Sequence, residues 1–199
     1  MPEQLADARQ RRTRAALYAA VLDLAAGSDP AEISVTALAA AAGVHRSTVY
    51  EHGGSPLGVL QRALAEELDM LREVHLRDVA PERVGEALRQ VTLGVFAHVD
   101  HYAAVYRNLD AASGATLHAF LSEHFQTSTR MLLAQSSLAI PFEIDTIDPR
   151  HVEDAAVRYI ADGVVGLIAV WLHEPEPRDP QVALELLGRL MPSWWPAAG

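Results

Sequence analysis

The sequence has 199 residues, of which 50% are apolar and 21% charged, and its formal net charge is −10. That balance is too apolar for a disordered chain, and the length allows a sizeable core. The absence of cysteine excludes disulfides, thiolate metal sites and cysteine nucleophiles. Because the N-terminus lacks the apolar core of a signal peptide and the longest apolar run has ten residues, 163–172, we expect a cytoplasmic protein without a membrane span.

Amphipathic stretches separated by proline and glycine follow one another along the whole chain. This pattern predicts an all-α fold of about nine helices. We expect the helices at residues 7–26, 35–41, 46–52, 56–80, 81–99, 102–109, 115–137, 150–173 and 180–191. The best strand candidate, 142–147, is short and isolated, so we expect no sheet.

The first expected helix carries a basic strip of four arginines, Arg9, Arg11, Arg12 and Arg14. Residues 1–60 hold five arginines against six acidic residues, whereas the remainder holds eleven against twenty. A local basic surface can bind phosphate even on an acidic protein, because the field at the contact surface is the one that counts. The distribution indicates that only the N-terminal part of the molecule meets nucleic acid.

Segment 34–52 has the spacing of a helix-turn-helix, whose second helix enters the major groove of DNA. Ser34 is a good N-cap, Ala39 allows close approach of the second helix, and Gly43 suits a turn with positive φ. Val49 can be buried against the first helix. A tight helical corner without DNA binding has the same spacing. The candidate DNA-contacting residues are Arg9, Arg12, Thr36, His45, Arg46, Ser47, Thr48, Tyr50 and His52.

Residues 10–60 resemble the tetracycline-repressor (TetR) family of bacterial transcriptional regulators. The likeness rests on the basic stretch, on Ser-Val-x-x-Leu-Ala-x-x-Ala-Gly-Val at 34–44 and on Arg-Ser-Thr-Val-Tyr-x-His at 46–52. Toward the C-terminus, the apolar stretch 159–172, a proline-containing loop and a leucine-rich last helix are similar to the dimerising end of many members. The resemblance implies a three-helix DNA-binding domain with a helix-turn-helix at 1–54, followed by a larger helical ligand-binding and dimerisation domain at 55–199.

The chain departs from the family pattern in two respects. Members commonly have an aromatic residue after the histidine, where this chain has Gly53 and Gly54, and a lysine after the following serine, where it has Pro56. Ser55 and Pro56 still form a good N-cap and first helical residue, so the helix end can hold a phosphate. We interpret the departures as weaker or differently poised DNA binding.

The middle helices are rich in aromatic residues and histidines, and in the family this region encloses a ligand pocket. Aromatic residues at helical spacing are also common in a plain core. His98 and His101 could share a metal ion, but nine histidines make such a pair expected by chance, so we predict neither a metal nor a cofactor. The candidate ligand-contacting residues are Phe96, Tyr102, Tyr106, Leu117, Phe120, Leu121, His124 and Tyr159.

The last two helices are apolar on two faces, and such a helix must be covered on both sides. One face can pack into its own bundle and the other against a second copy, although a simple buried core helix has the same pattern. The resemblance and the need to span a palindromic site favour a homodimer. The candidate interface residues are Val164, Ile168, Trp171, Leu187 and Leu190.

The sequence therefore predicts a ligand-responsive regulator, a repressor, that binds palindromic operator DNA as a dimer and is released by a small-molecule effector. A helical ligand-binding dimer that has lost DNA binding is the alternative. We predict no enzymatic activity, because the chain lacks Glu-x-x-His, Gly-x-Ser-x-Gly, His-Glu-x-x-His and a phosphate-binding glycine loop.

Overall fold

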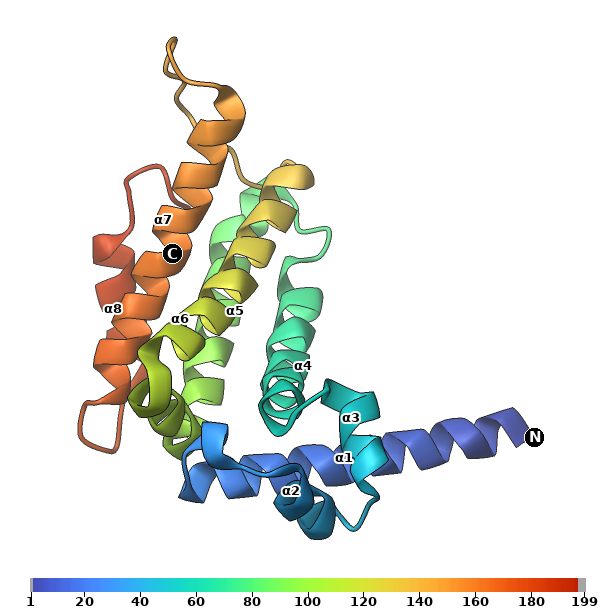
Figure 1. Ribbon diagram of the computed structural model, residues 1–199. Helices are drawn as coiled ribbons and strands as arrows, with labels where there is room; N and C mark the ends of the chain where they lie inside the picture. Colours follow the sequence, from blue (N-terminus) through green and yellow to red (C-terminus); the bar gives the residue numbers. More distant parts are fainter. Residues whose placement is uncertain (1, 197–199) are drawn as a thin grey trace. The chain divides into compact units, whose positions relative to one another are not determined.

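The computed structural model describes residues 2–196, with side chains described for residues 8–111 and 117–196 (Figure 1). Within that range all the regular secondary structure is helical and there is no strand, which confirms the all-α prediction. The helices are α1 Pro2–Gly27, α2 Val35–Ala42, α3 Arg46–Gly53, α4 Pro56–Leu76, α5 Val84–His101, α6 Ala103–Ala134, α7 Pro149–Leu172 and α8 Pro180–Leu190, with short 3₁₀ helices η1 at Pro30–Glu32 and η2 at Pro81–Arg83.

The chain divides into two compact units. The first, here called the N-terminal unit, comprises residues 2–66 and 102–114, and the second, the larger unit, comprises residues 67–101 and 115–196. The N-terminal unit thus extends past the domain boundary expected at residue 54 and takes in the first third of α6. Both α4 and α6 run from one unit into the other.

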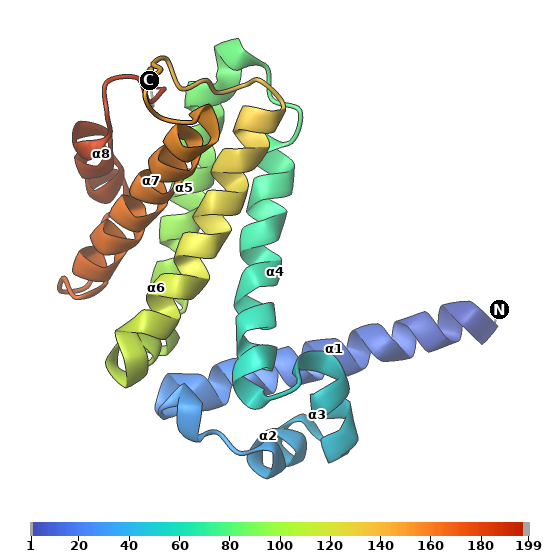
Figure 2. The same cartoon turned by 45° about the horizontal axis from the view of Figure 1, so that its top comes forward.

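Apolar side chains on one face of each helix form the core of the N-terminal unit. Leu17 and Val21 of α1, Leu38 of α2 and Val49 of α3 are all fully buried. In Figure 2, α2 and α3 lie against the long α1. Burying several large aliphatic side chains stabilises this small unit by about 1.5–3 kcal/mol for each one removed from water.

The larger unit is a bundle in which α5, α6 and α7 lie alongside one another, with α8 beside α7 (Figure 2). One cluster of buried apolar residues comes from α4, α5, α6 and the segment after α6: Leu76, Val84, Leu88, Leu132 and Leu138. By length and composition α7 could also cross a membrane, but half of its most apolar stretch is buried inside the protomer, as in the core helix of a soluble protein.

Two expectations about the helices differ from the structure. α6 is one helix of 32 residues where we expected two, because no proline interrupts it and a single internal glycine such as Gly114 costs a helix only about 1 kcal/mol. Helix α1 begins at Pro2 rather than near residue 7. The segment 142–147 forms no strand, as expected.

Candidate functional site

The helix-turn-helix is formed by local signals that the sequence already contains. The Ser34 hydroxyl accepts a hydrogen bond from the N–H of Ala37 at 3.1 Å and so caps α2. Gly43 has a φ of 65°, and the N–H of Val44 donates to the carbonyl of Ala39 at 3.0 Å, which closes the turn. The chain then enters α3 at Arg46, and Val49 holds α3 against the core of the unit.

The outer face of α3 is polar and open to solvent. His45, Arg46, Ser47 and Tyr50 are exposed, and Thr48 is half-buried. These side chains provide hydrogen-bond donors and acceptors of the kinds that read base edges and hold phosphates. Half-buried His52 instead donates from Nδ1 to the carbonyl of Thr48 at 3.0 Å.

The basic strip on α1 is exposed, but its arginines have different surroundings. Arg9 and Arg12 are exposed, and so is Thr36 at the start of α2. Arg14 forms an ion pair with Glu66 of α4 at 3.1 Å. That pair lies within the N-terminal unit and engages Arg14 with its own protomer, while Arg12 Nε donates to the carbonyl of Ala8 at 3.4 Å.

The α3–α4 junction explains the two glycines that replace the usual aromatic residue. A Cβ on Gly58 would lie 2.0 Å from the carbonyl oxygen of Gly53, and a Cβ on Gly53 would lie 2.4 Å from the backbone nitrogen of Val59. Gly54 has a φ of 71°, which L-residues rarely adopt. The Ser55 hydroxyl caps α4 by accepting from the N–H of Gly58 at 3.1 Å. Helix α3 is therefore joined to α4 by a backbone contact without intervening side chains.

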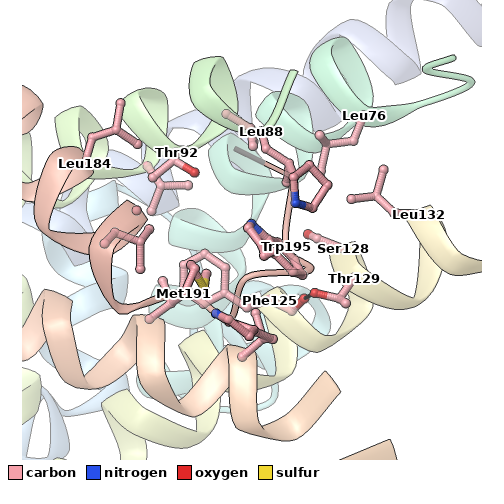
Figure 3. Close-up of a pocket in the computed structure, with 18 of the residues that line it drawn as sticks. Leu76, Leu88, Thr92, Phe125, Ser128, Thr129, Leu132, Leu184, Met191 and Trp195 are labelled. Atoms are coloured by element: carbon pink, nitrogen blue, oxygen red, sulfur yellow. Dashed lines mark hydrogen bonds between the residues drawn. The ribbon is translucent and has the colours of Figure 1, made fainter. Parts of the chain in front are cut away.

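The larger unit contains a cavity of about 250 Å³ between α5, α6, α7, α8 and the C-terminal segment 191–196 (Figure 3). Thr92 of α5, Phe125 of α6 and Leu184 of α8 point toward it, and Trp195 and Met191 of the C-terminal segment lie across it. Its described lining contains no Asp, Glu, Lys or Arg. The lining residues are Leu76, Leu88, Val91, Thr92, Val95, His124, Phe125, Ser128, Thr129, Leu132, Ile160, Val164, Leu184, Leu187, Gly188, Met191, Pro192, Ser193, Trp195 and Pro196.

Of the eight ligand-contacting residues expected from the sequence, His124 lines this cavity. Phe96 is buried and packs edge-on against Trp171, with ring centroids 4.9 Å apart. Leu117 and Leu121 are buried, Phe120 is half-buried, and Tyr159 is 67% exposed. Tyr102 and Tyr106 belong to the N-terminal unit. Sequence reasoning missed the C-terminal segment, although a tryptophan pair directly after the last amphipathic helix was an available signal.

Next to the cavity, two buried histidines of the larger unit contact charged groups on α4. His98 Nδ1 donates to Glu67 at 2.9 Å, while burial lowers the pKa of His98. Arg72 Nη1 lies 3.4 Å from His124 Nδ1, and Asp69 pairs with Arg72 at 2.5 Å. Burial, with a further contribution from Arg72, lowers the pKa of His124 to about 4, so this ring is neutral at pH 7.

Two other polar clusters lie in the larger unit. Arg178, in the loop before α8, is almost fully buried and pairs with Asp100 at 2.6 Å and Glu176 at 3.1 Å, over the ring of Trp171. Elsewhere in the unit, the buried Ser122 donates to Asp162 at 2.6 Å and lowers the pKa of that carboxyl. His118 contacts the same carboxylate oxygen rather than the Ser122 hydroxyl, so this trio lacks the serine–imidazole bond that activates a nucleophile.

Among the described residues, no group of three or more His, Asp or Glu side chains is arranged to hold a metal ion.

The structure places four of the five expected interface residues inside their own protomer. Val164, Ile168, Trp171 and Leu187 are at most 7% exposed, and two of them line the cavity. Leu190 is 62% exposed. The exposed apolar face of α7 and α8, here called the α7–α8 face, consists of Tyr159, Gly163, Gly166, Val170, Val182, Leu186 and Leu190. A Cβ on either of its glycines would meet no atom within 4 Å.

No protein-family model and no curated protein matches the chain. Its structure is similar to that of a TetR-family transcriptional regulator from Streptomyces coelicolor, with 22% identity, a TM-score of 0.60, and coverage of 90% of this chain and 78% of the other. A TetR transcriptional regulator from Streptococcus agalactiae 2603V is 18% identical, with a TM-score of 0.61 and coverage of 93% of this chain and 96% of the other. The TetR-family repressor AlkX from Dietzia sp. strain DQ12-45-1b is 20% identical, with a TM-score of 0.54 and coverage of 94% of this chain and 97% of the other. The chain has the fold of TetR-family transcriptional regulators.

Proposed function

We propose that this protein is a cytoplasmic transcriptional repressor that binds a palindromic operator as a homodimer and releases it when a small molecule occupies the cavity. The observation that carries the proposal is the helix-turn-helix with an exposed polar α3, found on the fold of known regulators. The uncharged cavity in the other unit supports the effector half of the proposal, since such cavities suit small molecules. We propose that the protein is not an enzyme.

In this proposal Arg46 reads a base edge, because arginine can pair bidentately with guanine in the major groove. It stands at the start of α3, where recognition helices of this motif contact bases. Arg9 and Arg12 hold phosphates. Neutralising one phosphate contact lowers the affinity for all sequences alike and reduces the salt slope by about one unit.

The test starts by selecting bound sequences from a random DNA pool with the purified protein. Arg46→Ala should then cost about 1–3 kcal/mol on the selected operator and relax selectivity at one base position. Arg189→Ala is the matched control, because Arg189 is exposed in the larger unit and, within the described part of the chain, forms its ion pair with Glu185 one turn away. An Arg46→Ala protein that binds as selectively as wild type contradicts the assignment. A pool without enrichment instead favours the helical ligand-binding dimer without DNA function.

The α7–α8 face is the proposed contact between two copies. Two helices from each copy would form a four-helix interface, and such symmetric interfaces suit palindromic sites spaced by one DNA turn. Val170→Glu or Leu190→Glu should give folded monomers, because both side chains are exposed in the protomer and a charge would be buried without a partner on association. Val74→Glu, at an equally exposed apolar position on α4, should stay dimeric.

Sedimentation and circular dichroism distinguish these outcomes from unfolding. Ile168→Glu should unfold the chain rather than only dissociate it, since Ile168 is 1% exposed within the protomer. A folded dimer of Val170→Glu would place the interface elsewhere. A folded monomer that binds the full operator at wild-type strength would contradict the two-headed mechanism.

Release of DNA requires an effector that binds the free and the operator-bound conformations with different affinities. We propose that α4 carries the coupling, because it begins directly after the reading helix and its second half contributes Leu76 to the cavity wall. Operator affinity measured with and without a bound compound tests this coupling.

A further inference from the structure

The cavity of the larger unit is suited to a neutral ligand. Its described lining has no charged side chain, and a charged ligand would lose its hydration without a counter-charge in return. At about 250 Å³ it is slightly below the roughly 300–1,000 Å³ of typical ligand pockets, so a small molecule fits it best.

Two of the hydroxyl groups that line the cavity donate hydrogen bonds to backbone carbonyls of α6. Ser128 donates to the carbonyl of His124 at 3.1 Å, and Thr129 donates to the carbonyl of Phe125 at 3.0 Å. These hydroxyls can accept a further hydrogen bond but cannot donate one without breaking the first. The other lining side chains that can donate are Thr92, Ser193, Trp195 and His124, of which His124 contacts Arg72 on α4.

The contact with Arg72 favours the tautomer of His124 that carries its proton on Nε2. An arginine side chain has only donors, so Nδ1 accepts in the 3.4 Å contact between Arg72 Nη1 and His124 Nδ1 when it has a lone pair. Asp69 Oδ1 lies 3.5 Å from the same nitrogen, but its charge is matched by Arg72 at 2.5 Å. Since the ring is held neutral, its single N–H is on Nε2, on the side of the ring away from α4.

We propose that the effector is a small, uncharged, largely apolar compound with a carbonyl acceptor, which receives a hydrogen bond from Nε2–H of His124 in this cavity. The proposal rests on the effector role proposed above. Occupation of Nε2–H strengthens the acceptor character of Nδ1, because hydrogen bonds in a chain polarise one another. The hydrogen bond from Arg72 on α4 to His124 is thereby strengthened. The bound compound thus acts on α4, the helix that follows α3 in the chain.

The experiment compares three probes of equal chain length that differ in the head group: octan-2-one, octanoate and octylamine. Binding to the wild-type protein is measured by calorimetry in the absence of DNA. We expect octan-2-one to bind most tightly. His124→Phe, which keeps a ring but removes the donor, should weaken octan-2-one binding about three- to tenfold, the usual range for one hydrogen bond. His124→Gln, whose amide can reach the place of Nε2, should restore part of that loss.

His118→Phe is the matched control, because His118 is exposed on the same helix and outside the cavity lining, and the ketone affinity of this variant should change less than twofold. The tautomer is checked in the wild-type protein by ¹⁵N NMR of the histidine rings, which does not depend on any variant folding. An Nδ1–H tautomer, tighter binding of octanoate or octylamine, or no binding of octan-2-one at its solubility limit overturns the proposal. Operator binding without ligand is measured separately, so a failure of the regulator function is distinguishable.

Discussion

Replacing Gly58 by alanine tests the backbone contact between α3 and α4. The added Cβ would lie 2.0 Å from the carbonyl oxygen of Gly53, while real Cβ contacts are essentially never under 3.0 Å, so the two helix ends must separate by roughly 1 Å. Overpacking of this kind costs about 1–3 kcal/mol, and the obstacle is backbone rather than a flexible side chain. The better helix propensity of alanine returns up to about 1 kcal/mol.

We therefore expect Gly58→Ala to lower the free energy of unfolding by about 1–2 kcal/mol and the melting temperature by roughly 2–8 °C. Affinity for the selected operator should fall as well, because α3 is displaced relative to α1 within the N-terminal unit. Thermal unfolding followed at 222 nm and fluorescence anisotropy with labelled operator measure the two effects.

Gly27→Ala is the matched control in the same unit. Gly27 ends α1, and a Cβ there would meet no atom within 4 Å, so only helix propensity changes. Its melting temperature should stay unchanged or rise slightly. Equal melting temperatures and operator affinities for Gly58→Ala, Gly27→Ala and wild type would refute the argument from close approach.

Three further predictions concern stability. Because the pKa of His124 is lowered to about 4 in the folded protein, the unfolded chain binds more protons below pH 6.5, and the free energy of unfolding should fall by roughly 3 kcal/mol between pH 6.5 and 4. Urea titrations at several pH values should show a smaller slope for His124→Gln, with the remainder due to His98, Glu86 and Asp162, whose pKa values are also lowered. Arg178→Met should lower the free energy of unfolding by about 2–3 kcal/mol. This is below the usual 3–5 kcal/mol for a broken buried pair, because the two carboxylate partners of Arg178 are partly exposed and regain water. An unchanged urea midpoint would contradict this. Ser34→Ala removes the cap of α2 and should cost about 1 kcal/mol, whereas Ser34→Thr should retain most of the stability.

The helix-turn-helix could be predicted from the sequence because its signals are local. Ser34 caps the helix that follows it and Gly43 adopts the positive φ that the turn requires, and neither depends on distant contacts. The α3–α4 junction was recognised only as a departure from a pattern. Its reason, the close approach of Gly58 to the Gly53 carbonyl, exists only in three dimensions.

The cavity and the α7–α8 face were harder to predict. α7 is apolar on two faces, and periodicity cannot tell which of them packs into its own bundle, so Ile168 was expected at an interface and is buried in the protomer. The cavity lining combines α4, α5, α6, α7 and α8 with the segment that carries Trp195, and such a combination depends on tertiary packing. The sequence offers only the residue type of His124 on an aromatic helix, whereas its contact with Arg72 on α4 depends on tertiary packing.

The position of α8 couples effector binding to dimerisation in this proposal, because the helix borders both the cavity and the proposed partner. Leu184 and Leu187 line the cavity, while Leu186 and Leu190, on the same eleven-residue helix, lie on the exposed face. If two copies associate there, any shift of α8 on filling the cavity also changes the dimerisation constant, and linkage requires the reverse. The apparent affinity for effector then depends on protein concentration. A cell that makes more of the protein would change not only the number of sensors but also the dose at which each one responds.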